Sequence, residues 1–198
     1  MEKKYCIEFV KKDIGLQNLE KSRILLNKNG FAVLKKSIPK KLILKVKHDV
    51  ETIIKKGEIS NKLRDIHFFK NGEISSAHNL LSYVKSYKKL LKAKIVTKII
   101  KNYLKEISKE EFNSSYFAKP KFQGLETKPH QDNAFFCMQP ADVLTCWMPI
   151  TFANKTNGSL YYYAGSHNLG NLKHKPHGNL GASMCLDFGV LKKINKNF

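Results

Sequence analysis

Arginine is almost absent from this chain of 198 residues, although its formal net charge is +20. Only Arg23 and Arg64 occur, so 34 of the 36 basic residues are lysines. Arginine reads bases and phosphates with a bidentate fork, and its scarcity argues against specific nucleic-acid recognition. The lysines are also spread along the whole chain. We interpret the positive charge as the result of a general bias toward lysine in this protein. The alternative is that the protein binds a polyanion or a membrane surface.

Paired cysteines and long apolar runs are lacking too. The four cysteines form no C-x-x-C pair, which excludes zinc-knuckle and thioredoxin-type sites. No run approaches the roughly 18 apolar residues of a transmembrane helix, and the charged N-terminus does not resemble a signal peptide. We therefore expect a reduced, soluble, cytoplasmic protein without a transmembrane segment. Its oligomeric state is unknown.

The pattern of the chain changes near residue 110. Before that point, apolar residues recur at helical spacing from Pro39 to a stop at Gly57, and again over residues 79–107. The apolar residues 31–34, which follow Gly30, predict a strand. We interpret the lysines on residues 79–107 as a solvated helix face, and the alternative is a membrane-surface or partner-binding helix.

Beyond residue 110, aromatic residues, glycine and asparagine become frequent, which indicates short strands. We expect these strands over residues 112–118, 134–138, 143–151 and 160–163. Prolines, glycines and the Asn157-Gly158 turn separate them. The chain length suits a single domain over residues 1–198, mainly helical over residues 1–110 and β-rich over residues 111–198.

His130 and Asp132 are the candidate metal ligands in this sequence. On an extended chain, side chains two residues apart lie on the same face, so these two converge while Gln131 turns away. One imidazole and one carboxylate are two of the three ligands of the 2-His-1-carboxylate triad that holds non-haem Fe(II). A lone His-x-Asp is a weak pattern, and the alternative is a surface pair in a turn. Aromatic neighbours and the β-like setting favour a metal site.

Several further motifs follow in order around this pair. They are Lys119-Pro120, His130-Gln131-Asp132-Asn133, Leu144-Thr145-Cys146-Trp147-Met148-Pro149, Asn157-Gly158-Ser159-Leu160 and Gly165-Ser166-His167. In order and spacing this run resembles the phytanoyl-CoA dioxygenase family. Residues 29–33 and 38–39 also resemble the opening strand and helix of that family.

The resemblance implies an α+β fold, with a double-stranded β-helix, or jelly-roll (cupin-like) barrel, and flanking N-terminal helices. It implies Fe(II), 2-oxoglutarate and O2 as reactants, and a small-molecule substrate. 2-Oxoglutarate would be decarboxylated to succinate and CO2 while a C–H bond is hydroxylated. By position, His130 and Asp132 would be iron ligands and Trp147 would line the co-substrate pocket. Lys119 and Gln123 could meet the co-substrate. The carboxylate at position 132 favours hydroxylation over halogenation.

The sequence departs from the family after residue 187. The family supplies a second histidine and a basic residue on later barrel strands, and nothing from Asp187 to Phe198 fits. We therefore expect a barrel that is incomplete at the C-terminus, a truncated or split gene product, and little turnover by this chain. One alternative is that His174 or His177, in a loop-like stretch, completes the triad. Another is a non-catalytic jelly-roll fragment or binding protein. The substrate, a small metabolite or an acyl compound, is not identified, because a fold does not specify it.

Overall fold

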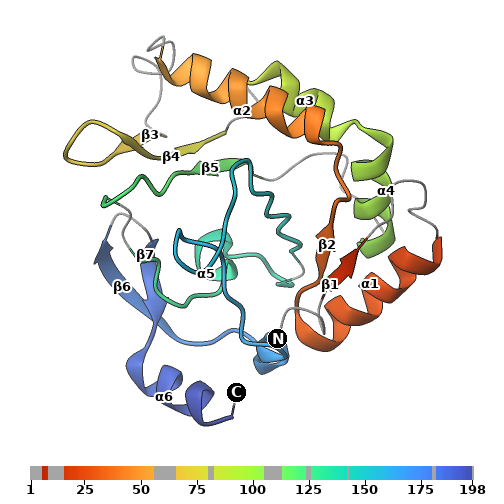
Figure 1. The fold of residues 1–198 in the computed structure, drawn as a ribbon. Coiled ribbons are helices and arrows are strands. Elements are labelled where there is room, and N and C mark those ends of the chain that lie inside the picture. Colours follow the sequence, from red (N-terminus) through yellow and green to blue (C-terminus); the bar gives the residue numbers. More distant parts are fainter. Residues whose placement is uncertain are drawn as a thin grey trace.

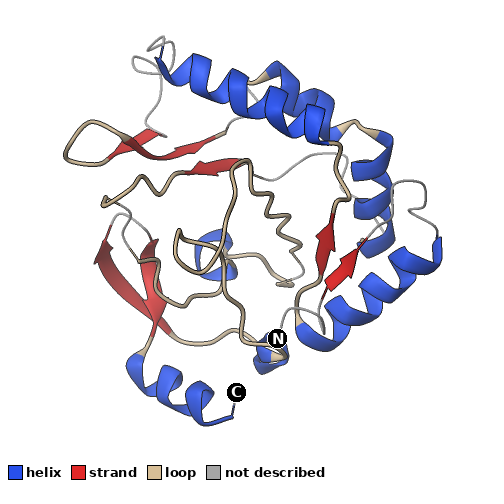
Figure 2. Ribbon diagram, viewed as in Figure 1, coloured by secondary structure: helices blue, strands red, loops and turns tan. Residues whose placement is uncertain are grey.

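The computed structural model describes residues 6–8, 16–55, 66–79, 83–104, 113–123, 126–141, 143–179 and 182–197. The helices are α1 (Leu16–Asn29), α2 (Lys40–Lys55), α3 (Lys85–Leu91), α4 (Lys94–Tyr103), α5 (Asn133–Phe136) and α6 (Phe188–Asn197). The strands are β1 (Cys6–Glu8), β2 (Val33–Lys35), β3 (Ile66–Phe68), β4 (Ile74–His78), β5 (Ser115–Phe117), β6 (His174–Asn179) and β7 (Ala182–Leu186). Most helices and short strands border the molecule, and loops occupy its middle together with the short helix α5 (Figures 1 and 2).

The strands form three small sheets and, in the part of the chain that the structure describes, no closed barrel. β1 and β2 are parallel, β3, β4 and β5 form an antiparallel sheet, and β6 pairs with β7 in an antiparallel hairpin. The jelly-roll barrel is therefore not confirmed. Residues 143–151 and 160–163, which we expected as strands, are not paired with any strand. A strand needs a hydrogen-bonded neighbour to be stable, whatever its side-chain pattern.

Three other expectations were wrong. Residues 134–138 are not a strand, because Asn133–Phe136 close one helical turn that ends at Cys137 in a left-handed conformation (φ 51°). A short apolar run does not by itself distinguish a helix from a strand. The helix over residues 79–107 is two helices, since Ala93 is extended (φ −63°, ψ 132°) between α3 and α4. The loop-like stretch that holds His174 and His177 is strand β6.

The predictions for β2, α2 and part of β5 are confirmed. The expected helix stop at Gly57 lies outside the described residues. None of the described helices is both long and apolar enough to cross a membrane.

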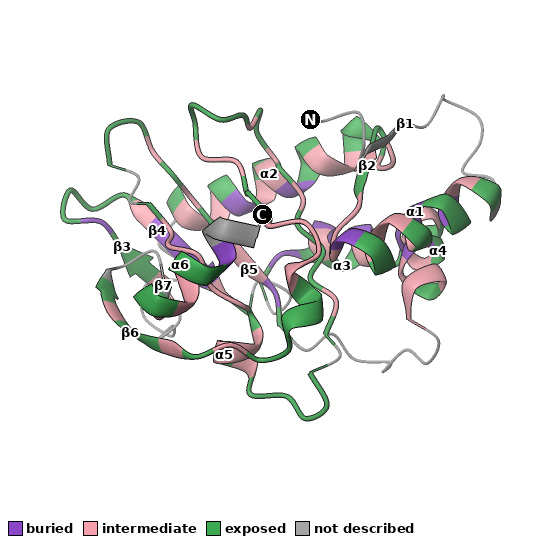
Figure 3. Ribbon diagram, turned by 90° about the horizontal axis from the view of Figure 1, so that it is seen from below, coloured by how far each residue is buried: buried purple, intermediate pink, exposed green. Residues whose placement is uncertain are grey.

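The hydrophobic core lies in the first part of the chain. Its buried side chains come from α2, β4, α3, α4 and the residue before α3: Val46, Val50, Ala77, Val84, Leu90 and Val96. Of the described residues after 117, Met148 alone packs against this cluster. None of the described residues from 115 to 178 is fully buried, and exposed or half-exposed residues dominate the loops and β6 (Figure 3).

The end of α1 connects the two parts of the chain. Gly30 adopts a left-handed conformation (φ 79°), and its N–H donates to the Leu26 carbonyl at 2.7 Å, which ends the helix. A Cβ atom on Gly30 would lie 2.7 Å from Nδ1 of His167. His167 donates from Nε2 to the Asn27 carbonyl at 2.9 Å, and the Gly165 N–H donates to the Asn29 carbonyl at 2.8 Å. The Gly165-Ser166-His167 element thus docks on the C-terminus of α1.

Candidate metal centre

His130 and Asp132 lie side by side in the loop that leads into α5. The distance between His130 Nε2 and Asp132 Oδ1 is 3.5 Å. The other ring nitrogen, Nδ1, lies 2.8 Å from the Lys128 carbonyl and donates to it. This bond fixes the ring so that Nε2 faces the carboxylate. The convergence predicted from the spacing is therefore present, although Asp132 has helical rather than extended backbone angles (φ −57°, ψ −31°).

Asp132 occupies the N-cap position of α5 but does not cap it with its side chain. An aspartate at this position normally accepts a hydrogen bond from the first turn of its helix. Here Oδ2 accepts a hydrogen bond from Thr145 Oγ1 at 2.7 Å instead. This contact leaves Oδ1 facing His130. The helical backbone angles of Asp132 differ from the extended angles of a residue that caps a helix with its side chain.

The two side chains shift each other's protonation. The hydrogen bond with Asp132 raises the pKa of His130, and burial partly opposes it. The hydrogen bond with His130 lowers the pKa of Asp132, burial opposes this, and the Thr145 bond adds to the lowering. Both shifts favour the charged forms, an imidazolium facing a carboxylate. A metal ion would replace the proton on Nε2.

One aromatic ring contacts His130, and a second aromatic pair lies among the chain's sequence motifs. Phe135 of α5 meets the His130 ring edge-on, with centroids 5.4 Å apart. Tyr162 stacks on Phe31 with centroids 5.0 Å apart. Burial, and then the charge of Asp132, raises the pKa of Tyr162. Sequence reasoning missed Thr145 and Tyr162, although both lie in motifs that it quoted or in the residues that follow them.

The far side of the same loop is anchored to residues 170–174. Gln131 turns away from the pair, as its spacing predicts. Its amide donates to the Gly170 carbonyl at 2.8 Å and accepts from the Leu172 N–H at 2.8 Å. The Gln131 N–H donates to His174 Nε2 at 2.9 Å, and His174 Nδ1 lies 2.8 Å from the Leu172 carbonyl. Both ring nitrogens of His174 are thus engaged with the backbone, which argues against its completing the triad.

The three expected co-substrate residues lie in different settings. Lys119 is exposed and follows β5, and its side chain crosses the Asn157-Gly158 turn so closely that a Cβ on Gly158 would lie 2.5 Å from Lys119 Cδ. Gln123 is exposed in a turn closed by its N–H and the Pro120 carbonyl at 3.1 Å. Trp147 is 44% exposed and lies two residues after Thr145. Their roles remain predictions.

A family comparison defines the class of this protein. The model of the phytanoyl-CoA dioxygenase family matches residues 26–181. The chain therefore belongs to that family, whose fold is cupin-like. It resembles Phytanoyl-CoA dioxygenase 1 of Oryza sativa subsp. japonica, with 40% identity over 57 residues. That stretch spans 29% of this chain and 20% of the rice protein. No solved structure matches the chain.

The donor set of the pair fits part of an iron site. A neutral imidazole nitrogen and a carboxylate oxygen are ligand types that suit divalent iron. The outward ring nitrogen is held by a carbonyl and the outward carboxylate oxygen by a hydroxyl, which is how ligands are oriented in metalloproteins. Among the described residues, however, no group of three or more His, Cys, Asp or Glu side chains could hold a metal ion. The pair offers two candidate ligands.

Proposed function

We propose that this chain carries the iron-binding loop of an Fe(II)- and 2-oxoglutarate-dependent dioxygenase that hydroxylates a small metabolite or an acyl compound. The supporting observation is the orientation of Asp132. It gives up the N-cap of α5, takes a hydrogen bond from Thr145 and directs Oδ1 at His130 Nε2, 3.5 Å away.

Each residue has a part in the proposed site. His130 and Asp132 would hold Fe(II), which when bound supplies activation of O2 and a place for 2-oxoglutarate. The Lys128 carbonyl keeps Nε2 of His130 free of the backbone, and Thr145 holds the carboxylate. Trp147, Lys119 and Gln123 are proposed to meet the co-substrate. The proposed setting is cytoplasmic, in keeping with the free cysteines Cys137, Cys146 and Cys185.

The first test is Fe(II) binding to the 198-residue protein under anaerobic conditions, by equilibrium dialysis. We expect weak binding that is lost in His130→Ala and in Asp132→Ala, because each substitution leaves a single ligand. His48→Ala is the matched control, since that histidine is exposed on α2. Binding that persists in His130→Ala would refute the assignment.

The second test is formation of succinate from 2-oxoglutarate with added Fe(II). We expect little turnover by this chain, because two ligands hold Fe(II) weakly and the described residues offer no third. A version extended by a strand that bears a histidine and a basic residue should turn over. Turnover by the 198-residue chain that is lost in His174→Ala would instead show that His174 completes the triad after rearrangement.

The second candidate function is a non-catalytic jelly-roll fragment or binding protein. The observation in its favour is the same limit of two possible ligands in the described part of the chain. The two candidates differ in the extended version. A non-catalytic protein would form no succinate in either form, with or without His130→Ala.

A further inference from the structure

The loop that carries the metal pair rests on the open end of the β6–β7 hairpin. His174, the first residue of β6, lies opposite Leu186, the last residue of β7. The Leu186 N–H donates to the Pro129 carbonyl at 2.9 Å. His174 Nε2 accepts a hydrogen bond from the Gln131 N–H at 2.9 Å. One pair of hairpin residues thus holds the backbone on both sides of His130.

The peptide between His130 and Gln131 decides whether the two candidate ligands converge. A peptide unit is planar, so the bond from its N–H to His174 fixes the orientation of the whole unit. Turning this unit would rotate the His130 side chain relative to Asp132, because a single residue separates the two. The distance of 3.5 Å between His130 Nε2 and Asp132 Oδ1 therefore depends on the acceptor that His174 supplies.

The Gln131 side chain attaches the loop a second time. Its carbonyl oxygen accepts from the Leu172 N–H at 2.8 Å, and its amide nitrogen donates to the Gly170 carbonyl at 2.8 Å. The Leu172 carbonyl lies 2.8 Å from Nδ1 of His174. A backbone N–H can only donate, so Nε2 of His174 is the acceptor and Nδ1 carries the proton that is donated to Leu172. Gln131, Leu172 and His174 thus form a closed ring of hydrogen bonds beside the loop.

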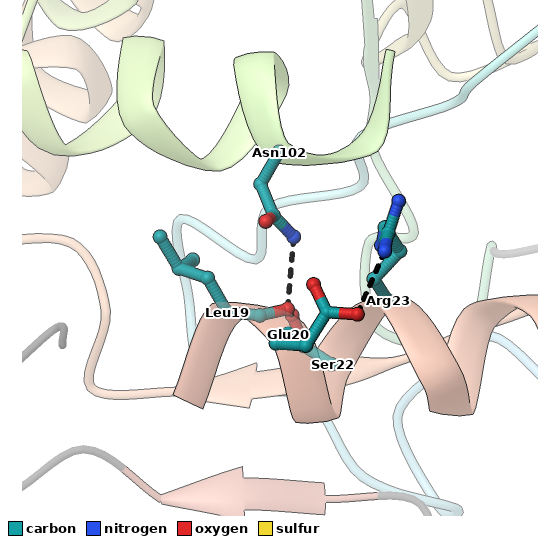
Figure 4. A network of polar contacts seen from close by, with 5 residues as sticks. All are labelled: Leu19, Glu20, Ser22, Arg23 and Asn102. Carbon is teal, nitrogen blue, oxygen red and sulfur yellow. Dashed lines mark hydrogen bonds and ion pairs between the residues drawn. The ribbon is translucent and has the colours of Figure 1, made fainter. Parts of the chain in front are cut away.

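Hydrogen bonds, and not apolar packing, fix this part of the chain, since none of the described residues from 115 to 178 is fully buried. A bond between a side chain and a distant backbone group in the first part of the chain has a different setting. Asn102 of α4 donates from Nδ2 to the Leu19 carbonyl of α1 at 2.8 Å (Figure 4), and Leu19 is 1% exposed. Packing at Leu19 supports that contact as well, whereas the loop at His130 depends on its hydrogen bonds.

We propose that Gln131 and His174 are positioning residues for the metal pair, which set metal affinity by holding the peptide between the two ligands. The proposal rests on the proposed function, because it requires His130 and Asp132 to bind the metal. It gives His174 a role other than that of a third ligand, since both of its ring nitrogens are used to hold the loop. Groups that orient metal ligands typically change metal affinity about 10–100-fold when they are removed.

The test is titration of the 198-residue protein with Co(II) in place of Fe(II), followed by the visible absorption of the bound ion, which reports coordination geometry. We expect His174→Leu to bind Co(II) about tenfold more weakly and with an altered spectrum, because the Gln131 N–H loses its acceptor. Gln131→Met, which keeps the length of the side chain but removes both of its hydrogen bonds, should have a similar effect. His174→Gln should restore most of the affinity, because its amide oxygen offers an acceptor in place of Nε2.

Asn102→Leu is the matched control, since it removes a comparable bond from the first part of the chain. It should lower the urea midpoint of unfolding and leave the affinity and the spectrum of Co(II) unchanged. An equal loss of affinity in Asn102→Leu and His174→Leu would overturn the proposal, because general destabilisation would then explain both. Equally weak binding in His174→Gln and His174→Leu would assign His174 as a ligand instead.

The variants of the pair separate failure of this proposal from failure of the proposed function. If His130→Ala abolishes Co(II) binding while His174→Leu and Gln131→Met bind it as the unaltered protein does, the positioning role alone is refuted. If the unaltered protein binds no Co(II), or if binding persists in His130→Ala, the metal assignment fails and the positioning role fails with it.

Discussion

The helical first part of the chain and the loop-rich second part are held together by different forces. Residues 16–104 bury a contiguous aliphatic cluster between α2, α3, α4 and β4. The described residues from 115 to 178 bury no residue fully, yet they contain the His130–Asp132 pair. They are held by hydrogen bonds, such as those of Gln131 with residues 170–172, and by close contacts at Gly30 and Gly158. The candidate chemistry therefore lies where local stability is expected to be lowest.

The contrast has a physical basis in strand pairing. Exposed aromatic side chains such as Phe152 (81%) and Tyr161 (67%) lie in segments whose backbone has no strand neighbour. A cupin-like fold buries such side chains between two sheets. Here both side chains stay largely exposed in the part of the chain that the structure describes. Four experiments test the contrast, from the largest expected effect to the smallest.

Two leucines provide the strongest comparison. Leu90 in the core is 2% exposed, whereas Leu160 is 46% exposed. We expect Leu90→Ala to lower the free energy of unfolding by about 2–5 kcal/mol, because it removes buried methyl groups and leaves a cavity. Leu160→Ala should change it by less than about 0.5 kcal/mol. Urea denaturation followed by circular dichroism measures both. Similar losses would mean that the second part has a core of its own.

Two glycines with the same backbone conformation allow the contact between α1 and residues 165–167 to be tested separately from backbone strain. Gly30 (φ 79°) faces the His167 ring, whereas Gly72 (φ 83°) has no atom within 4 Å of the position of a Cβ. Alanine at either site costs about 1 kcal/mol from the left-handed conformation. We expect Gly30→Ala to cost about 1–2 kcal/mol more, from the clash with His167.

A double variant, Gly30→Ala with His167→Ala, tests whether the His167 ring causes this extra cost. Adding His167→Ala to Gly30→Ala removes the obstructing ring, so the extra cost of the Gly30 substitution should largely disappear. If Gly30→Ala and Gly72→Ala cost the same, the docking of residues 165–167 on α1 contributes nothing to stability.

Sequence reasoning succeeded where a local pattern decides the structure. The spacing of Val46, Val50 and their neighbours is enough to define α2, and the spacing of His130 and Asp132 brings their side chains together. It failed where distant residues decide. Residues 143–151 have the composition of a strand, but no neighbour pairs with them. The Thr145–Asp132 bond joins positions 13 apart, and no local signal specifies it.

A substitution at Thr145 should have a smaller effect, on metal affinity in the second part of the chain. Thr145→Val keeps the shape of the side chain but removes the donor to Asp132 Oδ2, so the carboxylate is free to cap α5. We expect affinity for Co(II), used as an air-stable substitute for Fe(II), to fall about tenfold, with little change in stability. Thr151→Val is the exposed control. Unchanged affinity in Thr145→Val would show that the hydroxyl does not orient the ligand.

The smallest expected effect is the pH dependence of stability that the pair itself produces. The folded-state pKa of His130 is raised, chiefly by Asp132. The contribution of His130 to the free energy of unfolding is therefore complete below its unfolded-state pKa near 6.5. It is lost as pH rises through the raised folded-state pKa. The folded-state pKa of Asp132 is lowered, chiefly by His130. Its contribution is present above the unfolded value near 3.9 and is lost as pH falls through the lowered value. The pair should stabilise the fold most between about pH 4 and 6.5.

Asp132→Asn tests this window against a second ion pair in the first part of the chain. The Asp132 side chain is 45% exposed, so the loss at pH 5.5 should be at most about 1 kcal/mol, and it should shrink by pH 8 as His130 loses its proton. Asp49→Asn is the matched variant. Lys45 is the first cause of the lowered pKa of Asp49, and a lysine stays protonated at pH 8, so the loss in that variant should persist there. Urea unfolding of both variants and the unaltered protein at pH 5.5 and pH 8 measures the loss of stability of each variant at each pH. An Asp132→Asn loss that is equal at pH 5.5 and pH 8 would mean that Thr145, and not a charged His130, is what holds the carboxylate in place.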